Sequence, residues 1–422
     1  MNHEKIRESV SAFNARCALL DISFSGRHDD DIDEEKSGQT ASPNKHTLLL
    51  TKVTLPNIPI KTFFTNLKHL TSIILDDIRL SAVPEEVGLH FPNLENLSLN
   101  ENCLTSLPKM IGNLKNLKTL SFRKNNITEL PYTFKCLCRL EFLDASSNEL
   151  SEVPGKEMPL LSELLLANNS IHEFIVEKND FKSLKTLDLS HNSLECIHGP
   201  FLAINNLTKL YLYDNNLNEF PAFLTRLEKI TELDIGQNSI DILPEQFESY
   251  PVITKLHISY NNIKEFPIWF FQLSSIKNLS FCCNPLEQSC FNDFKMENFS
   301  NVESINAHYC EDCEIHNINI PYDILPSLPD EFGFLKNIID LNLSGIKLKT
   351  VPNSIGSMQS LTGLYLNNNL ITCLPETICH LTSLKYFHIS SNKLKELPES
   401  FGNLTSLQTF VVNDNYVRTR LD

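Results

Sequence analysis

A repeat of 23 residues constrains the fold of this chain more than any other feature. In the copy that begins at Leu94, leucine occupies positions 1, 4, 6, 11 and 14, asparagine position 9 and proline position 15. Further copies begin at Leu70, Leu117, Leu140, Leu161, Leu184, Leu207, Ile230, Ile253, Ile276, Ile315, Ile338, Leu361, Leu384 and Leu407. With an offset copy near residue 48 there are about 16 units. This periodicity predicts one stacked solenoid rather than several globular domains.

Each position of the repeat has a physical role. Positions 4 and 6 are apolar and alternate with polar neighbours, which predicts a short strand with one buried face. Proline at position 15 favours the start of a short helical or 3-10 return, and Ile111 and Leu114 should face back to the strand. The asparagine at position 9 follows the strand, where the turning backbone leaves polar groups unpaired. Because an amide both donates and accepts, we expect a ladder of buried asparagines between coils.

The segments LPKMIGNLKNL, LPDEFGFLKNI, VPNSIGSMQSL and LPESFGNLTSL resemble the leucine-rich-repeat family. Their Leu-Pro and Ile-Gly pairs are similar to the intracellular Ras-suppressor and Ras–Raf scaffold branch, over about residues 45–422. The resemblance implies an α/β fold. This is a right-handed solenoid curved like a horseshoe, with parallel strands on the concave face and short helical or 3-10 returns on the convex face. It further implies folded protein partners such as a Ras-type small GTPase, a kinase or a phosphatase subunit, and no cofactor.

The ends of the chain and one internal segment depart from the repeat. Residues 1–25 place apolar side chains on one face of a helix, which predicts a cap on the solenoid, with a partner-binding helix or disorder as alternatives. Residues 26–44 are rich in aspartate and glutamate and predict a flexible linker, followed by the repeat domain at 45–422. An irregular insertion is expected near 287–314, because 39 residues separate two successive copies there.

The insertion ends near a Cys-x-x-Cys motif with flanking histidines, formed by His308, Cys310, Cys313 and His316. These are ligand types suited to zinc, and they are the chain's candidates for a metal or redox site. A second spaced pair is absent from the sequence, so an irregular coil with packed or incidental cysteines is the favoured interpretation. The alternative is that the insertion forms a partner site.

Composition narrows the class of partner and the compartment. Lys and Arg number 36 against 52 Asp and Glu, a formal charge of −16, which disfavours nucleic acid. No stretch approaches the ~20 apolar residues of a membrane span, and the charged start lacks a signal-peptide core. The 12 scattered cysteines suggest reduced thiols. We therefore expect a cytoplasmic protein.

Positions 3, 5, 7 and 8 should point into the concavity and form the binding surface. In the coils from Leu184 to Ile253 they are aromatic and charged. These candidates are Asp188, His191, Lys209, Tyr211, Tyr213, Asp214, Asp234, Lys255, His257 and Tyr260. A second patch comprises Tyr365, Tyr386 and His388. The alternative is that exposed strand positions simply tolerate such residues.

The sequence thus favours a non-catalytic intracellular scaffold or adaptor in signal transduction. Asp188 with His191, or Asp234 with His257, could act as acid–base pairs, but an open strand face supplies no water-excluding cleft or second shell. Two other functions stay open: a structural or cytoskeleton-associated repeat protein, and an extracellular recognition ectodomain.

Overall fold

A computed structural model describes residues 47–51, 69–155, 157–177, 180–199, 204–247, 252–285, 302, 304–306, 333 and 335–417. The chain divides into two compact units. Unit 1 comprises Met1–Ser193 and Ile197–Asn206, and unit 2 comprises Leu194–Cys196 and Leu207–Asp422. The expected cap at 1–25, the linker at 26–44 and the four metal candidates, His308, Cys310, Cys313 and His316, lie outside the described residues and stay predictions.

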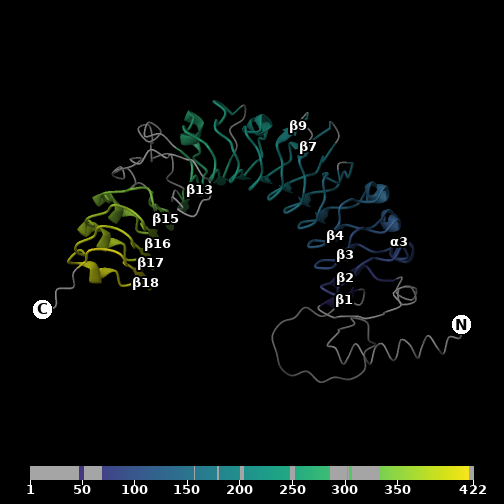
Figure 1. Cartoon of the computed structure of the whole chain (residues 1–422), viewed down its shortest axis with the longest axis horizontal. Helices are drawn as coiled ribbons and strands as arrows, with labels where there is room; N and C mark the ends of the chain where they lie inside the picture. Colours follow the sequence, from purple (N-terminus) through teal and green to yellow (C-terminus); the bar gives the residue numbers. More distant parts are fainter. Residues whose placement is uncertain are drawn as a thin grey trace, which may run out of the picture. The chain divides into compact units, whose positions relative to one another are not determined.

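Unit 1 contains a parallel sheet whose strands follow chain order, one per coil (Figure 1). They are β1 (Thr47–Thr51), β2 (Ser72–Asp76), β3 (Asn96–Ser98), β4 (Thr119–Ser121), β5 (Phe142–Asp144), β6 (Glu163–Leu165) and β8 (Thr186–Asp188). Neighbouring strands pair at equal repeat positions, so that Leu97 lies beside Leu120. The middle residue of each three-residue strand is buried and its neighbours are more exposed, as the period-2 pattern predicts.

Unit 2 continues the same pattern. Its strands are β10 (Lys209–Tyr211), β11 (Glu232–Asp234), β12 (Lys255–His257), β13 (Asn278–Ser280), β14 (Ser304–Asn306), β15 (Asp340–Asn342), β16 (Gly363–Tyr365), β17 (Tyr386–His388) and β18 (Thr409–Val411). The two units together contain sixteen such strands among the described residues. The sequence therefore predicted one strand per coil and the approximate number of coils correctly.

The register of one coil differs from the prediction. We expected the repeat to resume at Ile315 after an insertion near 287–314, but β14 lies inside that range and pairs directly with β15. Ile305 is the buried middle residue of β14 and lies opposite Leu341, so it occupies position 4 of the repeat. A strand needs only one such central apolar residue with backbone partners on both sides, so a coil can form without the full leucine pattern.

The returns are mostly 3-10 helices that begin after proline. They are η1 (Lys109–Asn113), η2 (Tyr132–Cys136), η4 (Ala222–Arg226), η5 (Ile268–Gln272), η9 (Asn353–Ser357), η10 (Glu376–His380) and η11 (Phe401–Asn403), and α3 (Val87–His90) is a single α-helical turn. Ile111 and Leu114 are fully buried, which confirms that these returns pack against the strands. None of the helices in the described part of the chain has the length and hydrophobicity of a membrane-spanning segment.

Two coils close differently, because position 15 is Ile175 in one and His198 in the other. Their returns are the short strands β7 (Glu173–Ile175) and β9 (Cys196–His198), which form a separate two-stranded sheet. The Val176 N–H donates to the His198 carbonyl at 2.9 Å. Without proline to fix φ, this part of the chain is free to extend. The prediction of a helical return was therefore wrong for these two coils.

The predicted asparagine ladder is confirmed. Asn125, 7% exposed, accepts at Oδ1 from the Leu104 N–H at 2.9 Å, and its Nδ2 donates to the Leu99 and Phe122 carbonyls at 3.0 and 2.8 Å. The amide thus joins its own coil to the preceding one. The pattern recurs at the following buried residues: Asn102, Asn148, Asn215, Asn238, Asn261, Asn284, Asn369 and Asn392.

The residue just before each ladder asparagine has a left-handed backbone. Position 8 has φ between 50° and 58° at Glu101, Lys124, Ser147, Asn168, His191, Asp214, Gln237, Tyr260, Cys283, Asn368, Ser391 and Asp414. This turn directs the next residue inward, so the asparagine reaches the core. L-residues rarely adopt this conformation, and its regular use without glycine was not visible in the sequence.

Candidate protein-binding surface

Strands β10, β11 and β12 place a row of opposite charges side by side in unit 2. Position 3 is Lys209, Glu232 and Lys255 on the three paired strands. The Lys209 and Lys255 ammonium groups lie 3.1 and 3.3 Å from the two carboxylate oxygens of Glu232, and the Tyr211 hydroxyl donates to Oε2 at 2.8 Å. The sequence analysis selected the two lysines and the tyrosine but missed Glu232. The available signal was that the charge at position 3 alternates along three successive coils, from lysine to glutamate to lysine.

The ionised state of Glu232 is stabilised by these neighbours. Its side chain is only 15% exposed, and burial by itself raises the pKa of a carboxyl group. The hydrogen bonds from Tyr211, Lys209 and Lys255 outweigh that effect and bring the pKa below its ordinary value. Glu232 is therefore ionised at neutral pH between two lysines whose side chains are 43% and 57% exposed.

A second group of side chains in contact consists of Tyr213, Asp234 and His257. Nδ1 of His257 lies 3.0 Å from Oδ2 of Asp234, and the imidazole stacks on the Tyr213 ring with centroids 5.5 Å apart and planes at 21°. Gly236 gives these rings their space, since a Cβ atom there would lie 3.0 Å from the Tyr213 ring and 3.1 Å from the His257 ring. Sequence reasoning missed Gly236. A glycine in the coil between those of Tyr213 and His257 was the available signal that two rings approach the backbone closely there.

Gln237 ties the second tyrosine to a further acidic residue. The Tyr213 hydroxyl donates to Oε1 of Gln237 at 2.6 Å, and Nε2 of Gln237 donates to Oδ1 of Asp214 at 2.6 Å. Asp214 and Tyr260 occupy the left-handed turn position at the end of their strands. Eight of the ten predicted residues thus belong to unit 2: Lys209, Tyr211, Tyr213, Asp214, Asp234, Lys255, His257 and Tyr260.

The other two predicted residues, Asp188 and His191, belong to unit 1. Oδ1 of Asp188 accepts from the Ser190 N–H at 2.9 Å, a local turn contact, and His191 has φ 53°. Both residues lie at the end of their strand, and the contacts described above around Glu232 and His257 join residues of unit 2.

Between these side chains the face is hollowed by about 310 Å³. The hollow is bounded by Tyr211, Glu232, Asp234, Lys255 and His257, and its lining includes the buried Leu233, Leu256 and Leu279. Charged and aromatic groups around a shallow apolar base are suited to receiving side chains of another protein. We refer to Tyr211, Tyr213, Glu232, Asp234, Lys255 and His257 as the unit 2 patch.

Together with the neighbouring Ser280, the patch contains the residue types of a hydrolytic triad, but only the bond between aspartate and histidine is present. Asp234, His257 and Ser280 are adjacent across β11, β12 and β13. A triad needs the serine oxygen bound to the second imidazole nitrogen. Instead, Oγ of Ser280 lies 2.7 Å from Oγ of Ser259, while the imidazole stacks on Tyr213. Among the described residues, no cluster of three or more His, Cys, Asp or Glu side chains is suited to a metal.

The second predicted patch is also assembled. The Tyr365 and His388 rings meet edge to face with centroids 5.1 Å apart, and Tyr386 is 40% exposed. Burial, Asp340 and Tyr386 raise the pKa of the Tyr365 hydroxyl, which stays protonated and able to donate. Gly363 leaves room for both neighbours, because a Cβ there would collide with Oδ1 of Asp340 and would lie 3.1 Å from the Tyr365 ring.

Comparison with known proteins agrees with this architecture. The sequence model of the family described as "Leucine-rich repeat region" matches residues 90–295 and 329–419 of this chain. A solved leucine-rich-repeat protein from Leptospira interrogans is similar at 28% identity and a TM-score of 0.63, over 85% of this chain and 82% of that one. A comparison with curated protein sequences found no match.

Two further solved structures share the fold alone. The ectodomain of the plant membrane receptor kinase GASSHO1/SCHENGEN3 from Arabidopsis thaliana, in complex with CASPARIAN STRIP INTEGRITY FACTOR 2, is 24% identical with a TM-score of 0.61, over 85% of this chain and 46% of that one. The effector YopM from Yersinia pestis is 23% identical with a TM-score of 0.55, over 88% and 84%.

Proposed function

Because the chain belongs to the leucine-rich-repeat family, we propose that it is a non-catalytic scaffold or adaptor that binds a folded protein through the unit 2 patch. The family generally mediates protein–protein interaction, and the strand face supplies the positions for it. The observation that supports this choice of site is the network around Glu232, in which two lysines and Tyr211 contact one carboxylate.

Contacts already present within the unit 2 patch reduce the entropic cost of binding. Side chains that are already ordered lose little freedom when a partner arrives. Tyr213 is held at both its ring and its hydroxyl, by His257 and Gln237 respectively. Tyrosine is among the residues that dominate binding energy at interfaces, so the two tyrosines are the proposed anchors and the surrounding charges select the partner.

The proposal extends to the partner and the compartment. By resemblance to the Ras-suppressor and Ras–Raf scaffold branch, the partner is a Ras-type small GTPase, a kinase or a phosphatase subunit in a cytoplasmic signalling pathway. Free cysteines support a reducing compartment, since Cys103, Cys138 and Cys373 are exposed thiols. Cell fractionation with a glycosylation assay tests the location. A glycosylated, secreted chain would exclude it.

Cross-linking mass spectrometry from native extract tests the function. We expect cross-links from Lys209 and Lys255 to one folded protein. The double variant Tyr211→Ala/Tyr213→Ala should then weaken binding of that protein by more than about 2 kcal/mol, because both anchors are lost. Tyr416→Ala, at a site 66% exposed in the last described coil, is the matched control. Equal affinity of the double variant and the control would instead favour a structural or cytoskeletal protein with distributed contacts.

A further inference from the structure

One coil of unit 1 is shorter than its neighbours and closes with a turn. Leu161 follows Leu140 after 21 residues rather than 23. After Pro154 the chain forms no 3-10 helix in the described residues. Gly155 has φ 82°, and the Met158 N–H donates to the Gly155 carbonyl at 3.0 Å. The return of this coil is therefore smaller than η2 of the coil before it.

The spacing between returns is set by the residue at position 19. In η1 this residue is Gly112, where a Cβ atom would collide with the Thr133 carbonyl, so η1 packs directly against η2. In η2 the same position is Lys135, whose ammonium nitrogen lies 4.0 Å from Oε2 of Glu157. Both side chains of this pair are largely exposed, at 64% and 70%. A hollow of about 470 Å³ lies beside them on the helix side of unit 1.

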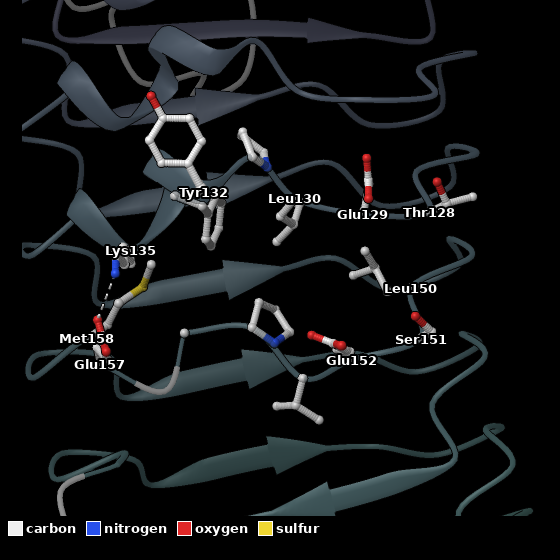
Figure 2. A pocket seen from close by; sticks show the side chains of 15 residues that line it. Thr128, Glu129, Leu130, Tyr132, Lys135, Leu150, Ser151, Glu152, Glu157 and Met158 are labelled. Carbon is white, nitrogen blue, oxygen red and sulfur yellow. Dashed lines mark ion pairs between the residues drawn. The ribbon is translucent and has the colours of Figure 1, made fainter.

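Figure 2 shows how this hollow is bounded. Leu130 and Tyr132 lie on one side, and Glu152, Glu157 and Met158 on the other. Leu150, Val153 and Met158, together with Phe134, are nearly buried and form an apolar floor. Tyr132 is 79% exposed, which is unusual for a large aromatic side chain and leaves its ring face accessible. We call this hollow the helix-side groove.

The rim of the groove is negative. Glu129, Glu152 and Glu157 contribute three carboxylates, and the cation Lys135 is already beside Glu157. Glu129 and Glu152 have no ion pair among the described residues, and both are exposed. Lys156 lies outside the described residues. An acidic rim attracts basic side chains, and the open ring of Tyr132 offers a face to the same cations.

We propose that the helix-side groove is a second docking site, which binds a short peptide segment with arginine or lysine next to bulky apolar residues. The apolar side chain enters the floor between Leu150 and Met158. The basic side chains pair with Glu129 and Glu152, and one of them lies over Tyr132. The volume falls within the roughly 300–1,000 Å³ of ordinary ligand pockets. This site is formed by unit 1 and is independent of the unit 2 patch.

Fluorescence polarisation of the full chain with a labelled short peptide of alternating arginine and leucine tests the proposal. We expect saturable binding, weakened at least about tenfold in Glu129→Gln/Glu152→Gln and about threefold or more in Tyr132→Ala. Both changes are at exposed positions, so the fold should persist, and circular dichroism verifies it. A peptide of alternating glutamate and leucine should not bind.

The net charge of −16 attracts basic peptides without any site, so a matched charge control is essential. Glu396→Gln/Glu399→Gln removes the same two charges from exposed positions of unit 2. This control, and Tyr211→Ala/Tyr213→Ala, should leave peptide affinity unchanged. An equal loss in the charge control, binding of the acidic peptide, or no binding of the basic peptide would each overturn the proposal without affecting the function proposed for unit 2.

Discussion

At the scale of single residues, the ladder asparagines are the most demanding positions in the chain. Asn238 is 8% exposed, and its Nδ2 donates to the Leu212 and Ile235 carbonyls at 3.0 and 3.1 Å while Oδ1 accepts from the Leu217 N–H at 3.1 Å. Asn238→Ala leaves that N–H without its acceptor, which should cost about 1–3 kcal/mol of unfolding free energy. Urea unfolding measures this. The exposed Asn216→Ala should change stability by less than about 0.5 kcal/mol, and equal losses would contradict the ladder.

Glu232 gives the surface a pH dependence with a definite sign. Its pKa in the folded chain lies below the ordinary 4.5, so folding favours the carboxylate. The stabilisation is fully present above pH 4.5 and disappears as the pH falls through the lowered pKa. Glu232→Gln should therefore lower the melting temperature at pH 7, and the difference from the unmodified chain should shrink at lower pH. A difference that grows on acidification would be inconsistent with the ion-paired geometry.

Sequence reasoning placed the candidate side chains on one face of the strands, because positions 3 and 5 of the repeat are fixed by the period of a strand. Their role in binding stays a prediction. It did not find Gly236 or Gln237. Their roles depend on which side chains meet across coils, and a repeat register alone does not specify side-chain contacts. The left-handed backbone at Tyr260 was equally hidden, since no glycine marks that position.

At the scale of elements, glycine at position 19 controls how closely successive returns pack. In Gly112→Ala the new methyl group would collide with the Thr133 backbone carbonyl of η2, and a backbone atom cannot rotate away. We expect a loss of about 1–3 kcal/mol, measured by chemical unfolding. Gly402→Ala is the matched control, because its Cβ would meet nothing within 4 Å among the described residues. Equal destabilisation by the two changes would show that glycine is needed at position 19 for its backbone freedom and not for close packing of the returns.

The elements also show what a repeat pattern specifies. Proline at position 15 predicted the 3-10 helices η1 and η2, since it fixes φ at the start of the return. Where Ile175 and His198 replace it, extended strands formed, and Gly199 with φ 131° permits their approach. The absence of proline was readable in the sequence, but the pairing of two such returns required the three-dimensional stack.

At the scale of the whole molecule, stability comes from stacking. A single coil orders 23 residues at a cost of roughly 1–2 kcal/mol each for the backbone, which its own apolar side chains cannot offset. Each strand is hydrogen-bonded to the strands of neighbouring coils, as β11 is to β10 and β12. Damage to one coil should therefore spread along the stack of its unit.

Leu212 tests this cooperativity, because it is fully buried at position 6, between β10 and the asparagine ladder. Leu212→Asp places an unpaired charge in the core, and we expect amide hydrogen exchange to accelerate in β11 and β12 as well as in β10. Asn218→Asp adds the same charge at an exposed site of the same coil and should leave exchange unchanged. Loss of protection confined to β10 would mean that each coil is stable by itself, and the solenoid would then be a chain of independent coils.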